Sequence, residues 1–247
     1  MTLEETISKL NDMKFHAMAA SLRERLARND HRDLAFEDML ALLVDDEWIA
    51  RENRKLTKRL KQAKFKKQAT MEDVNYQCKR GLVKSKMLDL TTLSWIKHHQ
   101  DVVFVGPTGV GKSYLAQALG FHACTKGYTV HYLRVSALLH QCGLAHADGS
   151  FAHLLAWMVK FDVLILDDWG IGTLKAQERR DILDLIEDRS EIRSTIITTQ
   201  LPFDHWHDFI GDETIADAIC DRIIHRACKI ELSGTSMRDP DKSGGET

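Results

Sequence analysis

The apolar run Val102–Val105 leads directly into the loop GPTGVGKS at 106–113, and this pairing limits the chain to few folds. The loop fits the pattern G-x-x-x-x-G-K-[ST], which binds phosphate when a strand precedes it and a helix follows. Its glycines permit positive φ angles, so that successive backbone N–H groups can turn toward one anion. We therefore predict a strand, a phosphate-binding loop and a helix over 114–122. A glycine-rich turn before an ordinary helix is the alternative.

The side chains of this loop have distinct chemical roles. Lys112 is expected to reach the β- and γ-phosphates of a nucleotide, and the Ser113 hydroxyl to bind Mg²⁺. The N-terminus of the following helix adds partial positive charge. The residues predicted to hold the nucleotide are Gly106, Pro107, Thr108, Gly109, Val110, Gly111, Lys112, Ser113 and Tyr114.

From residue 101 onward, the sequence pattern alternates between strands and helices. Alternation of this kind predicts an α/β fold with a parallel sheet covered on both faces, whose ligands bind at the carboxyl ends of the strands. We expect strands at 102–105, 129–135, 163–167, 194–199 and 228–232, and helices at stretches such as 175–190 and 214–225.

The stretch FDVLILDDWG at 161–170 resembles a buried strand that ends in two carboxylates. Such a Walker B pattern assigns Mg²⁺ binding to Asp167, directly or through water, and orientation of the attacking water to Asp168. Many proteins of this architecture have Glu at the second position, and the shorter Asp168 leaves turnover less certain. On its own, a pair of aspartates after a strand is also a common loop start.

Two later stretches supply further candidates. STIITTQLP at 194–202 ends in hydroxyl and amide groups beside the expected phosphate site, so Thr199 or Gln200 could sense the γ-phosphate; a Thr-rich strand end is the alternative. Arg222, on an expected helix, is the candidate to reach a neighbouring subunit's γ-phosphate, with a surface salt bridge as the alternative. Whether Arg238 contacts nucleotide is open.

The first 94 residues show helical periodicity, with almost no Gly or Pro. Up to Lys97 the chain has 20 Lys and Arg against 15 Asp and Glu, whereas the remainder is acidic. The segment 51–67 is the most basic, and a basic stripe on a helix suits a phosphate backbone. A solvated helix face is the alternative. The residues predicted to bind DNA are Arg51, Arg54, Lys55, Lys58, Arg59 and Lys61.

Composition excludes several other classes. The five cysteines form no C-x-x-C pair, and the histidines show no zinc-binding spacing, so we expect no metal besides Mg²⁺. No stretch reaches the length of a membrane span, and the acidic, polar N-terminus is unlike a signal peptide. We therefore expect a cytoplasmic protein without a membrane partner.

Several stretches in the same order carry a family resemblance: GPTGVGKSYLAQALG, VLILDDWG, STIITTQLP, IADAICDRIIHRA and IELSGTSMR. Together they resemble the IstB-type ATPases, the second protein of IstA/IstB insertion sequences. LNDMKFHAMAASLRERL and FEDMLALLVDDEWIARENRKLTKRLKQAKF resemble the N-terminal region of that family. IstB proteins are similar to the helicase loader DnaC and the initiator DnaA of the AAA+ class.

The resemblance implies a helical DNA-binding and assembly domain over 1–95 and an AAA+ ATPase core over 96–236. The composition of RDPDKSGGET at the end predicts a disordered tail over 237–247. It implies ATP and Mg²⁺ as cofactors, and as partners duplex DNA, other copies of the chain and the transposase of the same element. Hydrolysis would release or reset the assembly. A DnaC-like helicase loader, a small-molecule P-loop kinase and a nucleotide-binding architectural protein that barely hydrolyses remain alternatives.

Overall fold

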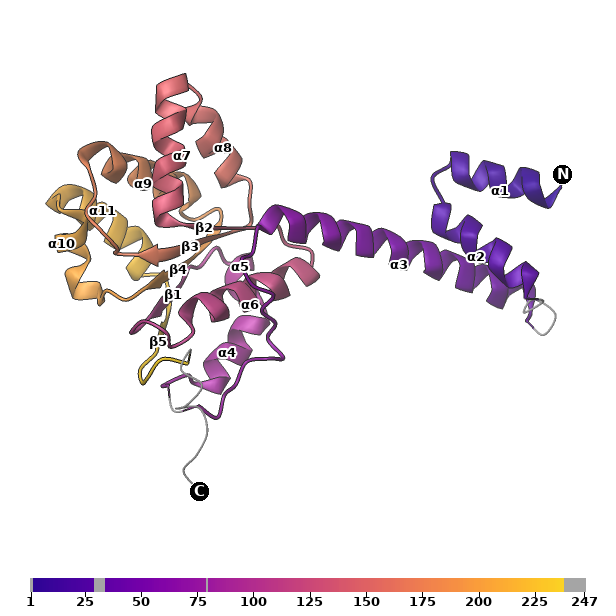
Figure 1. Cartoon of the computed structure of the whole chain (residues 1–247), viewed down its shortest axis with the longest axis horizontal. Helices are drawn as coiled ribbons and strands as arrows, with labels where there is room; N and C mark the ends of the chain where they lie inside the picture. The colour runs from indigo at the N-terminus through magenta and orange to yellow at the C-terminus, as the bar shows by residue number, and fades with distance from the viewer. Residues whose placement is uncertain (1, 29–33, 79, 238–247) are drawn as a thin grey trace. The chain divides into compact units, whose positions relative to one another are not determined.

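A computed structural model describes residues 2–28, 34–78 and 80–237 of the chain. The chain forms two compact units, which divide between Lys58 and Arg59 (Figure 1). Arg238 and the predicted tail beyond Met237 lie outside the described residues. Within the described ranges, no helix combines the length and apolar character that a membrane span requires.

The first unit is helical. It contains α1 (Leu3–Asp12), α2 (His16–Ala27) and most of α3 (Phe36–Ala63), whose final turn belongs to the second unit. The hydroxyl of Thr2 accepts the backbone N–H of Glu5, whose carboxylate accepts the N–H of Thr2. This capping box satisfies two otherwise unpaired donors and explains where α1 begins.

The second unit is built on a five-stranded parallel sheet. The strands are β1 (Val102–Val105), β2 (Val130–Arg134), β3 (Val163–Trp169), β4 (Ser194–Thr199) and β5 (Cys228–Glu231), in the order β2-β3-β4-β1-β5. The three central strands β3, β4 and β1 are almost wholly buried, as expected for a parallel sheet covered on both faces. The predicted α/β parallel-sheet class, preceded by helices, is confirmed.

Helices cover both faces of this sheet. Figure 1 shows α6 and α4 on one side of it and α7 and α8 on the other. The helices and the one 3₁₀ turn of this unit are α4 (Lys84–Thr91), α5 (Ser94–Lys97), α6 (Lys112–Thr125), α7 (Val135–Asp148), α8 (Phe151–Val159), α9 (Ala176–Arg189), η1 (Phe203–His205), α10 (Trp206–Ile210) and α11 (Glu213–Ile224).

The segment 59–95, which helical periodicity groups with the N-terminal region, packs on the second unit. The buried side chain of Gln117, on α6, accepts the backbone N–H groups of Lys66 and Lys67 at 2.8 and 3.1 Å. The imidazole of His122, further along α6, lies 3.0 Å from the carbonyl oxygen of Thr91. Periodicity identifies a helical stretch, but these contacts decide which unit it joins.

A buried polar centre lies at the amino ends of the strands. The guanidinium of Arg189 is 1% exposed and donates to the carbonyl oxygens of Met158, Phe161 and Ser194. Nearby, the Asp101 carboxylate accepts the backbone N–H of Thr195 at 2.6 Å. Burial raises the pKa of Asp101 to about 7, although that hydrogen bond and the charge of Arg189 oppose the rise.

Asp101 should make the stability of the second unit depend on pH. Its pKa is about 7 in the folded chain against an ordinary 3.8, so between these values the folded state holds a proton that the unfolded state has released. The free energy of unfolding should therefore fall as pH rises from about 4 to 7. Asp101→Asn keeps an acceptor for Thr195 and should flatten this dependence in urea unfolding measured at several pH values. A variant with the wild-type pH dependence would contradict the assignment.

Candidate functional site

The loop between β1 and α6 has the backbone conformation of an anion cradle. Gly106, Gly109 and Gly111 have φ angles of 154°, 88° and 99°. A Cβ atom at Gly106 would lie 2.2 Å from the carbonyl oxygen of Leu232, so no larger residue fits there. Pro107 and Thr108 are exposed, whereas Val110 is buried.

Lys112 and Tyr114 lie in the first turn of α6, directly after this loop. The ammonium of Lys112 donates to the carbonyl oxygens of Gly106 and Pro107, both at 2.7 Å. The Lys112 side chain is 8% exposed, so its charge stays at the loop rather than in bulk water. Tyr114 is half-buried.

Ser113 and Asp167, the two predicted Mg²⁺ ligands, lie side by side. The Ser113 hydroxyl donates to one carboxylate oxygen of Asp167 at 2.7 Å, which joins the start of α6 to the end of β3. These hard oxygen donors beside a phosphate loop fit Mg²⁺, which uses few protein ligands. Among the described residues, no three His, Cys, Asp or Glu side chains gather into a metal cluster of their own.

Two further hydroxyl groups, neither of them predicted from the sequence, hold the Asp167 carboxylate. Tyr132 on β2 donates to it at 2.6 Å, and Thr198 on β4 donates to the oxygen that also accepts Ser113. Burial and the contact with Asp167 raise the pKa of the Tyr132 phenol. Both residues occupy strands next to β3, so strand order is the signal that would have found them.

Asp168 interrupts the regular course of β3. Its φ angle is 63°, and the register with β4 shifts between Leu166 and Trp169. Positive φ is uncommon for a residue other than glycine, and such outliers gather at functional sites. The Asp168 carboxylate lies 3.1 Å from the Arg134 guanidinium at the end of β2, a partner that the sequence analysis also missed.

The two candidate phosphate sensors at the end of β4 have different surroundings. The buried Thr199 hydroxyl donates to the carbonyl oxygen of Trp169 at 2.9 Å and accepts the backbone N–H of Leu201. The side-chain oxygen of Gln200 instead accepts the hydroxyl of Thr108 at 2.6 Å. Gln200 therefore reaches the phosphate loop, whereas the Thr199 hydroxyl is bound to the backbone around it.

Arg222 lies on α11 and makes a surface salt bridge, the kind of contact expected as its alternative role, here with a residue of α9. Its guanidinium is 2.9 Å from the carboxylate of Glu187, on α9, and also donates to the carbonyl oxygen of Ala218. The Glu187 side chain is 57% exposed, so the pair lies at the surface.

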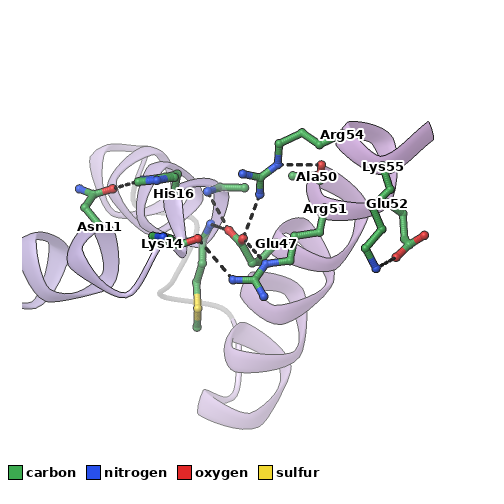
Figure 2. A network of polar contacts seen from close by, with 11 residues as sticks. Asn11, Lys14, His16, Glu47, Ala50, Arg51, Glu52, Arg54 and Lys55 are labelled. Carbon is green, nitrogen blue, oxygen red and sulfur yellow. Dashed lines mark hydrogen bonds and ion pairs between the residues drawn. The ribbon is translucent and has the colours of Figure 1, made fainter. Parts of the chain in front are cut away.

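The basic residues of α3 fall into two groups. Arg51 and Arg54 both bind Glu47, at 2.8 and 3.2 Å, and Figure 2 shows the two guanidinium groups turned toward this carboxylate. Lys55 pairs with Glu52 at 2.8 Å. By contrast, Lys58 and Lys61 are exposed, and neither takes part in an ion pair with another described residue. Arg59 is half-buried, and its Nε has no hydrogen-bond partner among the described residues.

Glu47 connects these arginines to α2. Its second carboxylate oxygen accepts the backbone N–H groups of Ala17 and Met18 at 2.9 and 3.2 Å. The residue before α2, Phe15, provides no side-chain cap, so Glu47 performs that function from α3. Burial alone would raise the pKa of Glu47, but hydrogen bonds from Arg51 and from the two N–H groups outweigh it and lower that pKa.

Comparison with known proteins decides the family. The model of the family described as IstB-like ATP binding protein matches residues 8–245, nearly the whole chain. The chain belongs to this family. An insertion sequence ATP-binding protein of Sinorhizobium fredii is 44% identical to this IstB-like protein over 238 residues, with 96% of this chain and 97% of the relative covered.

Solved structures show the same core fold. A crystal structure of DnaI has a TM-score of 0.57 at 20% identity and covers 67% of this chain and 91% of that one. A crystal structure of the DnaC helicase loader has a TM-score of 0.50 at 23% identity, covering 58% of this chain and 86% of that one. The predicted AAA+ core and its resemblance to DnaC are thus confirmed at the level of the fold.

Removing the Glu47 charge should loosen α2. Glu47→Gln retains an acceptor but loses the charge that holds two arginines and two backbone donors, and hydrogen bonds to charged groups contribute about 1.5–3 kcal/mol. We expect amide hydrogen exchange in the first turn of α2 to quicken at least about tenfold. Glu52→Gln is the matched control on the same helix, because the Glu52 carboxylate pairs with Lys55 at the surface. Equal exchange in the two variants would contradict the capping role.

Proposed function

We propose that this protein binds ATP with Mg²⁺ and hydrolyses it as the timing step of a helper of DNA transposition. The observation that carries the proposal is the Ser113–Asp167 contact, which brings a predicted Mg²⁺-binding hydroxyl and carboxylate together beside the phosphate loop. Membership of a family described by ATP binding, with a relative named for an insertion sequence, supports the same reading.

The phosphate loop supplies the binding step. Its backbone N–H groups would donate hydrogen bonds to the phosphate oxygens, and the Lys112 ammonium would exchange the Gly106 and Pro107 carbonyls for the β- and γ-phosphates. Ser113 and Asp167 would hold Mg²⁺, which when bound neutralises charge on the phosphates. Tyr132 and Thr198 fix the orientation of the Asp167 carboxylate, so little rearrangement is needed at that residue.

Three other residues complete the proposed hydrolysis. Asp168 would orient the attacking water, with Arg134 holding its carboxylate in place. Between the two sensor candidates, the bond to Thr108 favours Gln200. Arg222 would act on the nucleotide of a neighbouring copy. Its surface pair with Glu187 is weak enough to open, since exposed pairs contribute about 0–1 kcal/mol.

On the DNA side, we propose that the exposed cations Lys58 and Lys61 contact duplex phosphates. Arg51 and Arg54 instead support the helical unit through Glu47, and any contact they make with DNA is secondary. An assembly of several ATP-bound copies on duplex DNA would then recruit and stimulate the transposase of the same element. Hydrolysis would release that assembly.

The ATP site is tested with two variants. Asp168→Asn should bind MgATP like wild type but hydrolyse it on the order of 100-fold more slowly, because it loses the charge that would orient the water while the residues of the phosphate loop stay unchanged. Lys112→Ala should lose binding itself. Asp208→Asn, at an exposed carboxylate, is the control and should turn over normally. A wild-type protein whose ATP turnover does not respond to duplex DNA would count against the proposed helper.

The DNA contact is tested by charge reversal. Lys58→Glu with Lys61→Glu should weaken duplex binding at least about tenfold and lower the slope of log affinity against log salt by about two. Lys126→Glu with Lys160→Glu reverses two exposed lysines elsewhere and serves as the control. Undiminished binding would place the DNA contact on other residues. Preference for a single strand would favour the helicase-loader alternative.

A further inference from the structure

Two carbonyl groups of the phosphate loop are held by donors from distant parts of the chain. The carbonyl oxygen of Val110 accepts the Arg80 guanidinium at 3.0 Å. The carbonyl oxygen of Gly109 accepts the backbone N–H of Met237 at 2.9 Å. One donor thus comes from the segment before α4, and the other from the segment that follows β5.

These contacts determine where the neighbouring N–H groups point. In a trans peptide unit, the C=O and N–H bonds point in opposite directions. Because Met237 and Arg80 hold the carbonyls of Gly109 and Val110, the N–H groups of Val110 and Gly111 point away from these donors, toward what we call the inner side of the loop. In a phosphate loop, that inner side is where the anion binds.

The packing around the loop glycines supports this arrangement. A Cβ atom at Gly111 would lie 2.6 Å from the Arg80 guanidinium, and one at Gly109 would lie 2.2 Å from the Ser236 hydroxyl. Gly111 thus makes room for the Arg80 donor, and Gly109 makes room for Ser236, the residue before the Met237 donor, in addition to permitting positive φ.

Arg80 is unusual for a buried cation. It is 4% exposed, and it donates to the carbonyl oxygen of Asn75 and to the sulfur of Met237 as well as to Val110. Among the described residues, no carboxylate forms a salt bridge with it, and its Nε is buried without a hydrogen-bond partner. A buried charge without a counter-ion is costly, and a polyanion bound at the adjacent loop would supply the missing negative charge.

We propose that Arg80 is a positioning residue of the nucleotide site. Together with the Met237 N–H, it holds the phosphate loop in its binding conformation; we call this pair of contacts the brace. Nucleotide binding and the packing of segment 232–237 against the loop should therefore strengthen each other. This inference rests on the proposed ATP binding. Because linkage is reciprocal, detaching segment 232–237 from the loop must weaken the affinity for nucleotide, and bound nucleotide must slow amide hydrogen exchange in the segment.

The brace is tested by binding of MgATP and MgADP to the full-length protein. Arg80→Met keeps the volume but loses the charge and the donors, and should weaken both nucleotides at least about tenfold. Met237→Pro loses both the side chain and the backbone N–H, whereas Met237→Ala loses the side chain and keeps the N–H. Met237→Pro should therefore also weaken binding, and Met237→Ala should bind nearly as well as wild type. Wild-type affinity in both Arg80→Met and Met237→Pro would overturn the proposal.

Amide hydrogen exchange separates this inference from the proposed function. Without nucleotide, the N–H groups of Ser233 and Met237, which bond the carbonyls of Arg80 and Gly109, should exchange faster in Arg80→Met than in wild type. Unchanged exchange would overturn the brace even if ATP binds. A wild-type protein that binds no nucleotide would instead refute the ATP site. The comparison of hydrogen exchange without nucleotide would still show whether Arg80 holds the segment on the loop. If Arg80→Met fails to fold, the difference in nucleotide affinity between Met237→Pro and Met237→Ala tests the proposal.

Discussion

The contact between the Ser113 hydroxyl and the Asp167 carboxylate depends on the parallel sheet, and the rest of the site is organised around it. Parallel strands bring the carboxyl ends of β1, β3 and β4 to one edge, where a loop rich in glycine can meet a carboxylate some fifty residues later. Hydroxyl groups from β2 and β4 then hold Asp167 from both sides. A single carboxylate therefore connects the four central elements of the site.

Charge has two different roles in the N-terminal unit. A small helical unit buries few apolar side chains, and here a buried carboxylate, Glu47, joins two helices by capping one and binding two arginines of the other. Those arginines hold the unit together, whereas Lys58 and Lys61, further along α3, are exposed. Some basic residues of α3 therefore stabilise the helical unit, and others are exposed to solvent.

Local signals made much of the second unit predictable. Val102–Val105 and Ser194–Thr199 have the bounds expected from their apolar runs, and the phosphate loop lies where its motif places it. Contacts between distant residues that belong to no recognised motif were not predictable, because no spacing rule encodes them. Glu47 caps a helix thirty residues earlier, and Arg80 braces a loop thirty residues later. Counting cations along α3 likewise could not show which of them face a carboxylate.

We propose that the nucleotide state controls assembly on DNA, and mass photometry of the protein can measure this directly. Particle mass would be measured with ATP, with ADP and without nucleotide, each with and without a duplex. The account predicts multi-subunit particles with ATP and duplex together, and smaller ones with ADP. The same particle mass in every nucleotide state would contradict it.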